Sequence, residues 1–491
     1  MAHSVNNPIV RISRYLLILC GLFYLCLFLF TALSRIGYRF ELEWVEGNVA
    51  DTVVRLLNGQ SIYAQPSVSF IANIYTPLFF YVAAIPSAIQ GVGFPPLRLV
   101  SLLSTLGCFA VIWIWVRREG GDIISALSGV CLFAAIFALG GAWFDLARTD
   151  MLFILLYLWA AYMLRFAKHI GAYLFASVLI FLAFFTKQSA LFIIAPLFLF
   201  VLLQDWKKAL ASIVLLVLLI VVSTLWFDSI YNGWYSYFVW YLPSHFSQEM
   251  DWNNFIPFFS NELFLPLLIT LIISIVLLIL YRGNKDRRFW FYLLLLLGVI
   301  GETIPARLSR IAYVNHMIPV YAVLSIMFGL GISVVPRWMA GWKQATHKVL
   351  VPVFYLLCIV QFAILIYDPF KYIPTRADEE AGEHFLDVLR NIPGDVYVPS
   401  HSFVPTLAGK QSHAHTTCIH VVLVSDPGAV SRRLKEELTE MTNRRVFPAY
   451  ILDARTSMPG YMESGKVFDR DDVFWTRSGD RTRPNYIYQV K

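Results

Sequence analysis

Apolar runs recur along most of the chain, and this pattern constrains the fold more than any other feature. A helix needs about 20 apolar residues to cross a lipid bilayer. The composition, with 58% hydrophobic and 14% charged residues and a mean hydropathy of +0.63, excludes a soluble globular protein. We therefore expect an integral, multi-pass α-helical membrane protein. The runs cover residues 15–33, 76–91, 97–116, 123–141, 150–166, 171–186, 188–203, 209–227, 261–281, 289–304, 313–333 and 349–366.

Basic residues in the short links between these runs predict the topology. Links rich in Lys and Arg usually stay in the cytoplasm. Arg117 and Arg118 lie in the cytoplasm only if the chain crosses the bilayer once between them and the external loop that follows the first span. Only one of the two runs 76–91 and 97–116 can therefore span the bilayer. The run 76–91 is the shorter and contains two prolines, which suits an interfacial or re-entrant segment. About eleven transmembrane helices remain, and the other basic links, 11–14, 165–169, 205–208, 282–288 and 336–348, then also lie inside.

This topology divides the chain into two domains. Residues 1–366 form a transmembrane domain with a cytoplasmic N-terminus, a retained first helix and an external loop, 34–96, that carries juxtamembrane helices. Residues 367–491 are richer in charge and show helix, turn and strand patterns, which predicts a small extracytoplasmic α/β domain. The protein should lie in the plasma or inner membrane. The Lys and Arg residues of the cytoplasmic links account for its net charge of +7, so a nucleic-acid-binding face is not needed to explain that charge.

Cysteine and histidine spacing predicts no cofactor, disulfide framework or zinc site. Of the six cysteines, only Cys418 lies in polar sequence. It follows His413 and His415 and precedes His420, but no second cluster with metal-binding spacing accompanies them, so a solvent-facing loop or strand is favoured. The acids of the external loops are compatible with a divalent cation, although no spacing assigns one.

Two glutamates in the first external loop are candidate catalytic bases. Glu43 and Glu46 are three residues apart at the start of an amphipathic pattern, so their side chains can share one face of a helix. A carboxylate held in a partly desolvated pocket can have a raised pKa and accept a proton from a hydroxyl group. The alternative, which spacing alone favours, is that both glutamates simply stabilise a helix N-terminus.

The sequence FDLARTDML places Arg148 and Asp150 at the external entrance of a predicted span. Charged residues at a membrane span are costly and indicate function by default. An Arg–Asp pair at a helix end can also be purely structural, and the two interpretations are equally favoured.

Several cations violate the positive-inside pattern. Lys187, Arg307 and Arg310 fall in short external loops, close to His316. Arg gives bidentate hydrogen bonds to phosphate, and Lys acts as a point charge, so these residues suit a phosphate at the membrane surface with an apolar tail. The alternative is that their side chains anchor lipid headgroups.

Four segments, in order along the chain, resemble the GT-C superfamily of polytopic glycosyltransferases. They are YTPLFFY from Tyr75, ARTDML from Ala147, TKQSAL around Lys187 and RIAYVNHMIPVYAVL around His316. The pattern is most similar to the branch with protein O-mannosyltransferases and the aminoarabinose transferase that modifies lipid A. Enzymes of this superfamily take sugars from polyprenyl-phosphate carriers on the outer or luminal face.

The resemblance implies a role for each candidate residue. An acid of the first external loop is the base in such enzymes, which implies Glu46 first and Glu43 second. The frequent Asp-Glu pair is replaced here by Val45-Glu46, so the choice between the two glutamates stays open. Asp150 and Arg148 would support the base or orient the acceptor. The implied substrate-binding residues are Arg148, Lys187, Arg307, Arg310, Tyr75 and His316.

The predicted function is transfer of a sugar from a polyprenyl-phosphate donor to an acceptor hydroxyl of a glycan, lipid or protein, with inversion, on the extracytoplasmic face of the bilayer. A transporter or flippase of a lipid-linked sugar is the alternative. Such transporters bind near the bilayer midplane and often contain repeats, whereas the candidate charges here lie at span ends. A membrane-anchored scaffold would not need about eleven spans.

Overall fold

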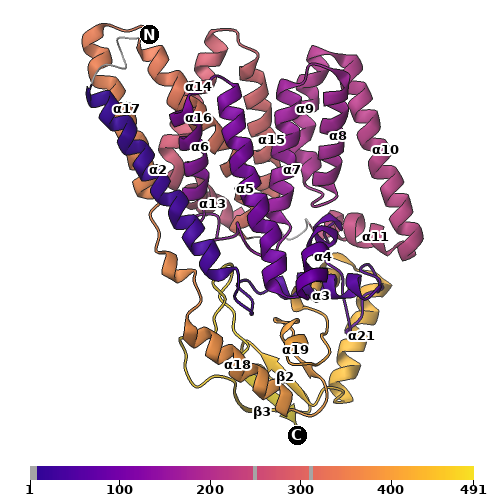
Figure 1. Cartoon of the computed structure of the whole chain (residues 1–491). Helices are drawn as coiled ribbons and strands as arrows, with labels where there is room; N and C mark the ends of the chain where they lie inside the picture. The colour runs from indigo at the N-terminus through magenta and orange to yellow at the C-terminus, as the bar shows by residue number, and fades with distance from the viewer. Residues whose placement is uncertain (1–7, 247–251, 309–312) are drawn as a thin grey trace.

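The computed structural model describes residues 8–246, 252–308 and 313–491, and most of them are helical. The eleven runs predicted to span each contain a helix, and these helices stand side by side as one bundle (Figure 1). They are α2 (Pro8–Arg35), α5 (Phe94–Arg118), α6 (Ile123–Ala135), α7 (Asp150–Phe166), α8 (Ile170–Phe184), α9 (Ala190–Gln204), α10 (Trp206–Tyr231), α14 (Leu265–Gly283), α15 (Arg288–Leu308), α16 (Ile318–Met339) and α17 (Gln344–Ile364). Among the described residues, seven helices are long and apolar enough to cross a membrane by length and composition, so the number of eleven stays a prediction.

The bundle is built around α16, whose apolar residues are almost entirely buried. Small residues let α6 approach it closely: a Cβ added at Gly129 would come 2.9 Å from the carbonyl oxygen of Ser325. At the other extreme, α10 lies at the edge of the bundle, and most of its apolar side chains are exposed. An apolar exposed face of this kind is what a lipid-facing helix requires.

The run 123–141 is helical only as far as Ala135. Residues 136–149 form a buried, irregular connection instead. Gly141 and Ala142 both have positive φ angles, +75° and +56°, which a continuing right-handed helix does not allow. This connection carries the segment that ends at Asp150, so its shape decides where that segment lies.

Short helices cover the end of the bundle that faces the C-terminal domain. The helices α3 (Glu46–Leu57) and α4 (Leu78–Gln90) lie between the bundle and the C-terminal domain (Figure 1). The residues just before α4 are fastened to the end of α8, because the Thr76 hydroxyl donates to the Phe184 carbonyl at 2.7 Å and the Leu78 amide donates to the Phe185 carbonyl at 2.8 Å. This placement agrees with an interfacial position for the run 76–91.

The C-terminal domain contains a small sheet with the strand order β1-β2-β4-β3. The strands are β1 (Val396–Tyr397), β2 (Ala449–Leu452), β3 (Tyr461–Lys466) and β4 (Tyr486–Val490), and only β1 and β2 are parallel. The helices are α18 (Arg376–Asn391), α19 (Val404–Leu407), α20 (Thr416–Ser425) and α21 (Ala429–Asn443). A capping box formed by Thr375 and Asp378 begins α18. The segment 409–420, expected as a solvent-facing loop or strand, instead leads into α20 and has Cys418 and His415 buried.

Candidate active site

A cavity of about 730 Å³ lies where the bundle meets the C-terminal domain. Its walls come from six parts of the chain: the segment between α2 and α4, the connection before α7, the start of α9, residues 238–243, the end of α15 with the residues that follow, and the C-terminal domain. The polar side chains in these walls are Glu43, Asn73, Tyr75, Arg148, Lys187, Gln188, Ser189, Glu302, Tyr313, Asn315, His316, Thr416, Thr417, His420 and Asp480. Apolar side chains from α9 and from residues 238–243 complete it.

Glu43 is the cavity carboxylate best suited to accept a proton. Its Oε2 lies 3.2 Å from Nη1 of Arg148, and the Arg148 guanidinium lies over the ring of Trp143. Burial raises the pKa of Glu43, and although Arg148 opposes this rise, the pKa reaches about 7. A carboxylate with a pKa near neutrality can be ionised at rest and still bind a proton during a reaction.

Asp150 lies behind this wall and organises it. Its carboxylate accepts hydrogen bonds from Trp143 Nε1 at 2.9 Å, Lys187 Nζ at 3.1 Å and Asn315 Nδ2 at 3.1 Å. These donors come from three separate segments, and all three residues line the cavity, whereas Asp150 does not. Asp150 therefore fixes where the Lys187 charge and the Trp143 ring sit.

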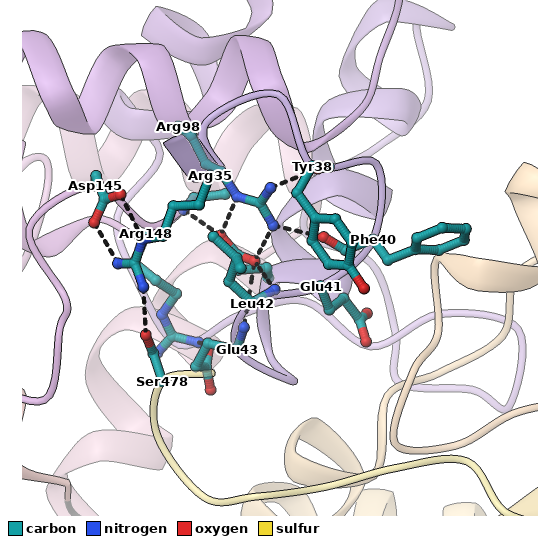
Figure 2. Close-up of polar contacts among 12 residues, drawn as sticks. Arg35, Tyr38, Phe40, Glu41, Leu42, Glu43, Arg98, Asp145, Arg148 and Ser478 are labelled. Atoms are coloured by element: carbon teal, nitrogen blue, oxygen red, sulfur yellow. Dashed lines mark hydrogen bonds and ion pairs between the residues drawn. The ribbon is translucent and has the colours of Figure 1, made fainter. Parts of the chain in front are cut away.

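Glu46 points away from the cavity and is satisfied by protein groups. Its carboxylate is fully buried and accepts from Nε and Nη2 of Arg98 at 3.0 and 2.7 Å, and from the amides of Leu42 and Ala147, both at 2.7 Å. Burial raises the pKa of Glu46, but Arg98 outweighs this effect and holds the pKa below its usual range. The same guanidinium donates to the carbonyls of Tyr38 and Phe40 (Figure 2). This geometry favours a structural role for Glu46.

A second buried pair joins α2 to the connection before α7. Arg35 Nε donates to Asp145 Oδ2 at 2.8 Å, and both side chains are fully buried. The same guanidinium donates to the Ala142 carbonyl at 2.6 Å. It also donates to Ser478 Oγ at 3.2 Å (Figure 2). Arg35 thus binds the first helix, the cavity wall and the C-terminal domain together.

The structure brings some of the predicted site residues together and separates others. Tyr75, Lys187 and His316 share the cavity with Glu43 and Arg148. Arg307 does not line it, and its Nη2 pairs with Glu262 Oε1 at 2.6 Å. Arg310 lies outside the described residues. The cation that pairs with Glu43 is therefore Arg148, which the sequence analysis placed at the entrance of a predicted span.

The sequence analysis missed Arg98, Glu302, Arg35 and the C-terminal helix α20. Arg98 and Glu302 lie inside apolar runs, where an ionisable residue is by default a functional or paired one, so a signal for both was present. Arg35 follows an apolar run directly and reads as an ordinary flanking charge. No sequence pattern indicates that α20 forms part of a cavity wall. Among the described residues, no group of three or more His, Cys, Asp and Glu side chains could hold a metal ion.

Comparisons with known proteins agree with this architecture. A model of the dolichyl-phosphate-mannose-protein mannosyltransferase family matches residues 75–227, which include Tyr75, Arg148, Asp150 and Lys187. The fold is similar to that of ArnT from Cupriavidus metallidurans in the apo state, with a TM-score of 0.58 and 12% identity over 86% of this chain and 90% of that one. The chain has the GT-C fold. The expected fold class is thereby confirmed, and the protein is a multi-pass membrane protein of that class.

Two further structures share this GT-C fold. ArnT of the same organism bound to undecaprenyl phosphate gives a TM-score of 0.58 and 12% identity, covering 89% of this chain and 92% of that one. The oligosaccharyltransferase of Archaeoglobus fulgidus gives a TM-score of 0.50 and 11% identity, covering 88% of this chain and 69% of that one. No curated protein matches the sequence.

Proposed function

We propose that this GT-C protein is a membrane glycosyltransferase that moves a sugar from a polyprenyl-phosphate donor to an acceptor hydroxyl on the extracytoplasmic face. The observation that carries the proposal is the shared cavity, in which a carboxylate with a pKa near 7, Glu43, stands with the cations Arg148 and Lys187. The family model that matches residues 75–227 and the structure of ArnT with undecaprenyl phosphate support the same donor class.

In the proposed reaction, Glu43 accepts the proton of the acceptor hydroxyl while the oxygen of that hydroxyl attacks the anomeric carbon of the sugar. The bond between that carbon and the phosphate oxygen breaks, the phosphate keeps the electron pair, and the sugar configuration inverts. Lys187, held by Asp150, and Arg148 stabilise the charge that develops on the leaving phosphate. Tyr75 and His316 complete the donor-binding wall, and the buried position of the cavity limits competing hydrolysis.

Glu43 replaces Glu46 as the proposed base. The Glu46 carboxylate is surrounded by five hydrogen-bond donors and has no free face toward the cavity. Arg307, paired with Glu262, is likewise a weaker choice for phosphate binding than Lys187. A transporter or flippase is not favoured, because the matched family and the similar structures are glycosyltransferases.

The test incubates purified protein in lipid nanodiscs with a panel of polyprenyl-phosphate sugars and candidate acceptors, and measures release of polyprenyl phosphate. Glu43→Gln should lower kcat by about 10²- to 10⁴-fold, the usual contribution of a general base. Glu436→Gln, an exposed acid on α21, is the matched control and should leave kcat unchanged. Full activity of Glu43→Gln would remove Glu43 from the mechanism, and wild-type protein that consumes no donor in the panel would refute the function.

A further inference from the structure

The loop that carries Glu43 is held in place by the C-terminal domain rather than by the membrane helices alone. The Leu42 carbonyl, one residue before Glu43, accepts from the amides of Arg477 and Ser478 at 2.8 and 2.9 Å. The Trp44 carbonyl, one residue after Glu43, accepts from Nε2 of His415 at 3.1 Å. The peptide groups on both sides of the proposed base are therefore fixed by residues more than 350 positions away in the chain.

The side chain of Glu43 is packed from the same direction. A Cβ added at Gly479 would lie 3.1 Å from Glu43 Cγ and 3.4 Å from Trp143 Cζ3, so the backbone of residues 477–479 rests directly against the base. Gly479 has a φ of +69°, which glycine adopts without strain. No larger residue could bring the C-terminal chain this close without moving Glu43.

His415 is the side chain that makes this arrangement specific. It is fully buried, and its Nδ1 accepts a hydrogen bond at 3.1 Å from the Thr417 amide, which caps the N-terminus of α20. Because Nδ1 accepts, the proton of the neutral ring must be on Nε2, which then donates to the carbonyls of Trp44 and Ser400, both at 3.1 Å. One imidazole thus caps a helix with one nitrogen and holds the base loop with the other.

The surroundings of His415 keep the ring in this neutral form. Burial and, to a lesser degree, the nearby charge on His401 lower its pKa to about 4. A protonated imidazole would lose the acceptor that the Thr417 amide requires. The capped helix also carries Thr416 and Thr417, which line the same cavity as Glu43.

We propose that His415 is a positioning residue for transfer: it sets the Trp44 peptide, and through it the direction of the Glu43 carboxylate, and so makes the C-terminal domain a working part of the active site. The proposal rests on the glycosyltransferase function proposed above. It assigns to the C-terminal domain a role that covering the cavity alone would not require.

Two substitutions separate the functions of the two ring nitrogens. His415→Asn places a side-chain oxygen near the position of Nδ1 and keeps the helix cap, but it is too short to reach the Trp44 carbonyl. His415→Gln places an amide nitrogen near the position of Nε2 and keeps the donor, but it loses the cap. If His415 positions the base, kcat should be low for His415→Asn and much higher for His415→Gln. If His415 only caps α20, the order should be reversed.

For His415→Asn we expect a fall in kcat of about 10-fold or more, with the KM for the polyprenyl-phosphate donor changed less than 2-fold, because loss of alignment affects the transition state more than donor binding. Wild-type kcat in this variant overturns the proposal. A lower kcat in His415→Gln than in His415→Asn, together with a lower melting temperature, overturns it as well.

Amide hydrogen exchange tests the same contact without any assay of transfer. His415→Asn should raise the exchange rate of peptides covering residues 41–46 and leave peptides of α20 unchanged. Unchanged exchange at 41–46 overturns the proposal even if transfer falls. If the exchange rate rises in His415→Asn but the wild type consumes no donor, the exchange result supports the positioning contact. The missing donor consumption then counts only against the proposed function.

Discussion

Replacing Glu46 with glutamine separates a structural carboxylate from a catalytic one. All five groups that contact the Glu46 carboxylate are donors: Nε and Nη2 of Arg98 and the amides of Leu42, Glu43 and Ala147. Glutamine keeps the shape of the side chain but turns one oxygen into an NH₂ group that faces only donors. It also leaves the fully buried Arg98 guanidinium without a counter-charge.

The expected cost follows from the geometry. Breaking a buried ion pair by removing one partner costs about 3–5 kcal/mol, and here neither side chain has access to water that could offset it. Glu46→Gln should therefore lower the melting temperature in nanodiscs by several degrees and reduce the yield of folded protein. Glu43→Gln should lower the melting temperature less, because the Glu43–Arg148 pair has a single contact at 3.2 Å that the glutamine oxygen can still accept, and because removing the Glu43 charge also removes a desolvation cost that raises its pKa.

The assay compares thermal unfolding and single-turnover transfer for the two variants, with Glu436→Gln as the exposed control. The expected pattern is a stability defect for Glu46→Gln and a rate defect for Glu43→Gln. If Glu46→Gln is as stable as the wild type and transfers sugar at least about 10²-fold more slowly, Glu46 is the base and the present argument is refuted.

Four further outcomes follow from the same contacts. Because Glu43 must be ionised to accept a proton and its pKa is about 7, kcat/KM should rise with pH through 7 and level off above it; a flat profile from pH 6 to 8 contradicts this role. Lys187→Ala should lower kcat/KM by about 10²-fold, measured beside the exposed Lys371→Ala control, and an unchanged value would place the phosphate elsewhere. Gly479→Ala should lower kcat, because the added Cβ pushes on Glu43, and a wild-type rate would show that the contact between Gly479 and Glu43 does not constrain the carboxylate. Burial lowers the pKa of His401, but Asp453 and Glu41 raise it to about 10, so protonation of His401 stabilises the fold fully below pH 6.5 and this contribution is lost as the pH rises through 10; His401→Gln should flatten that part of the melting-temperature profile.

Local sequence patterns predicted the helices well, because hydrophobic run length depends only on neighbouring residues. The run 76–91 became the short helix α4 at the end of the bundle that faces the C-terminal domain, as its length and prolines indicated. The run 123–141 was overestimated, since the positive φ angles at Gly141 and Ala142 end regular structure that apolar character alone would continue.

The site was predicted less completely, because its geometry depends on contacts between distant segments. Sequence spacing placed Glu43 and Glu46 on one helical face, yet Glu43 precedes α3 and turns toward Arg148, while Glu46 begins α3 and turns toward Arg98. The proposal of Glu43 rather than Glu46 as the base rests on the Glu46–Arg98 ion pair, and Arg98 lies inside an apolar run. The cavity wall formed by α20 had no local signal at all.

The hydrogen bonds of Arg35 have a consequence for the assembly of the protein. This arginine ends α2, yet its guanidinium donates to Ser478, 443 positions later in the chain. The set of Arg35 partners is therefore complete only once the C-terminal domain has docked on the bundle. A chain in which this docking fails would keep the Asp145 counter-charge of Arg35 but lose the Ser478 acceptor, so the end of α2 would be held less firmly.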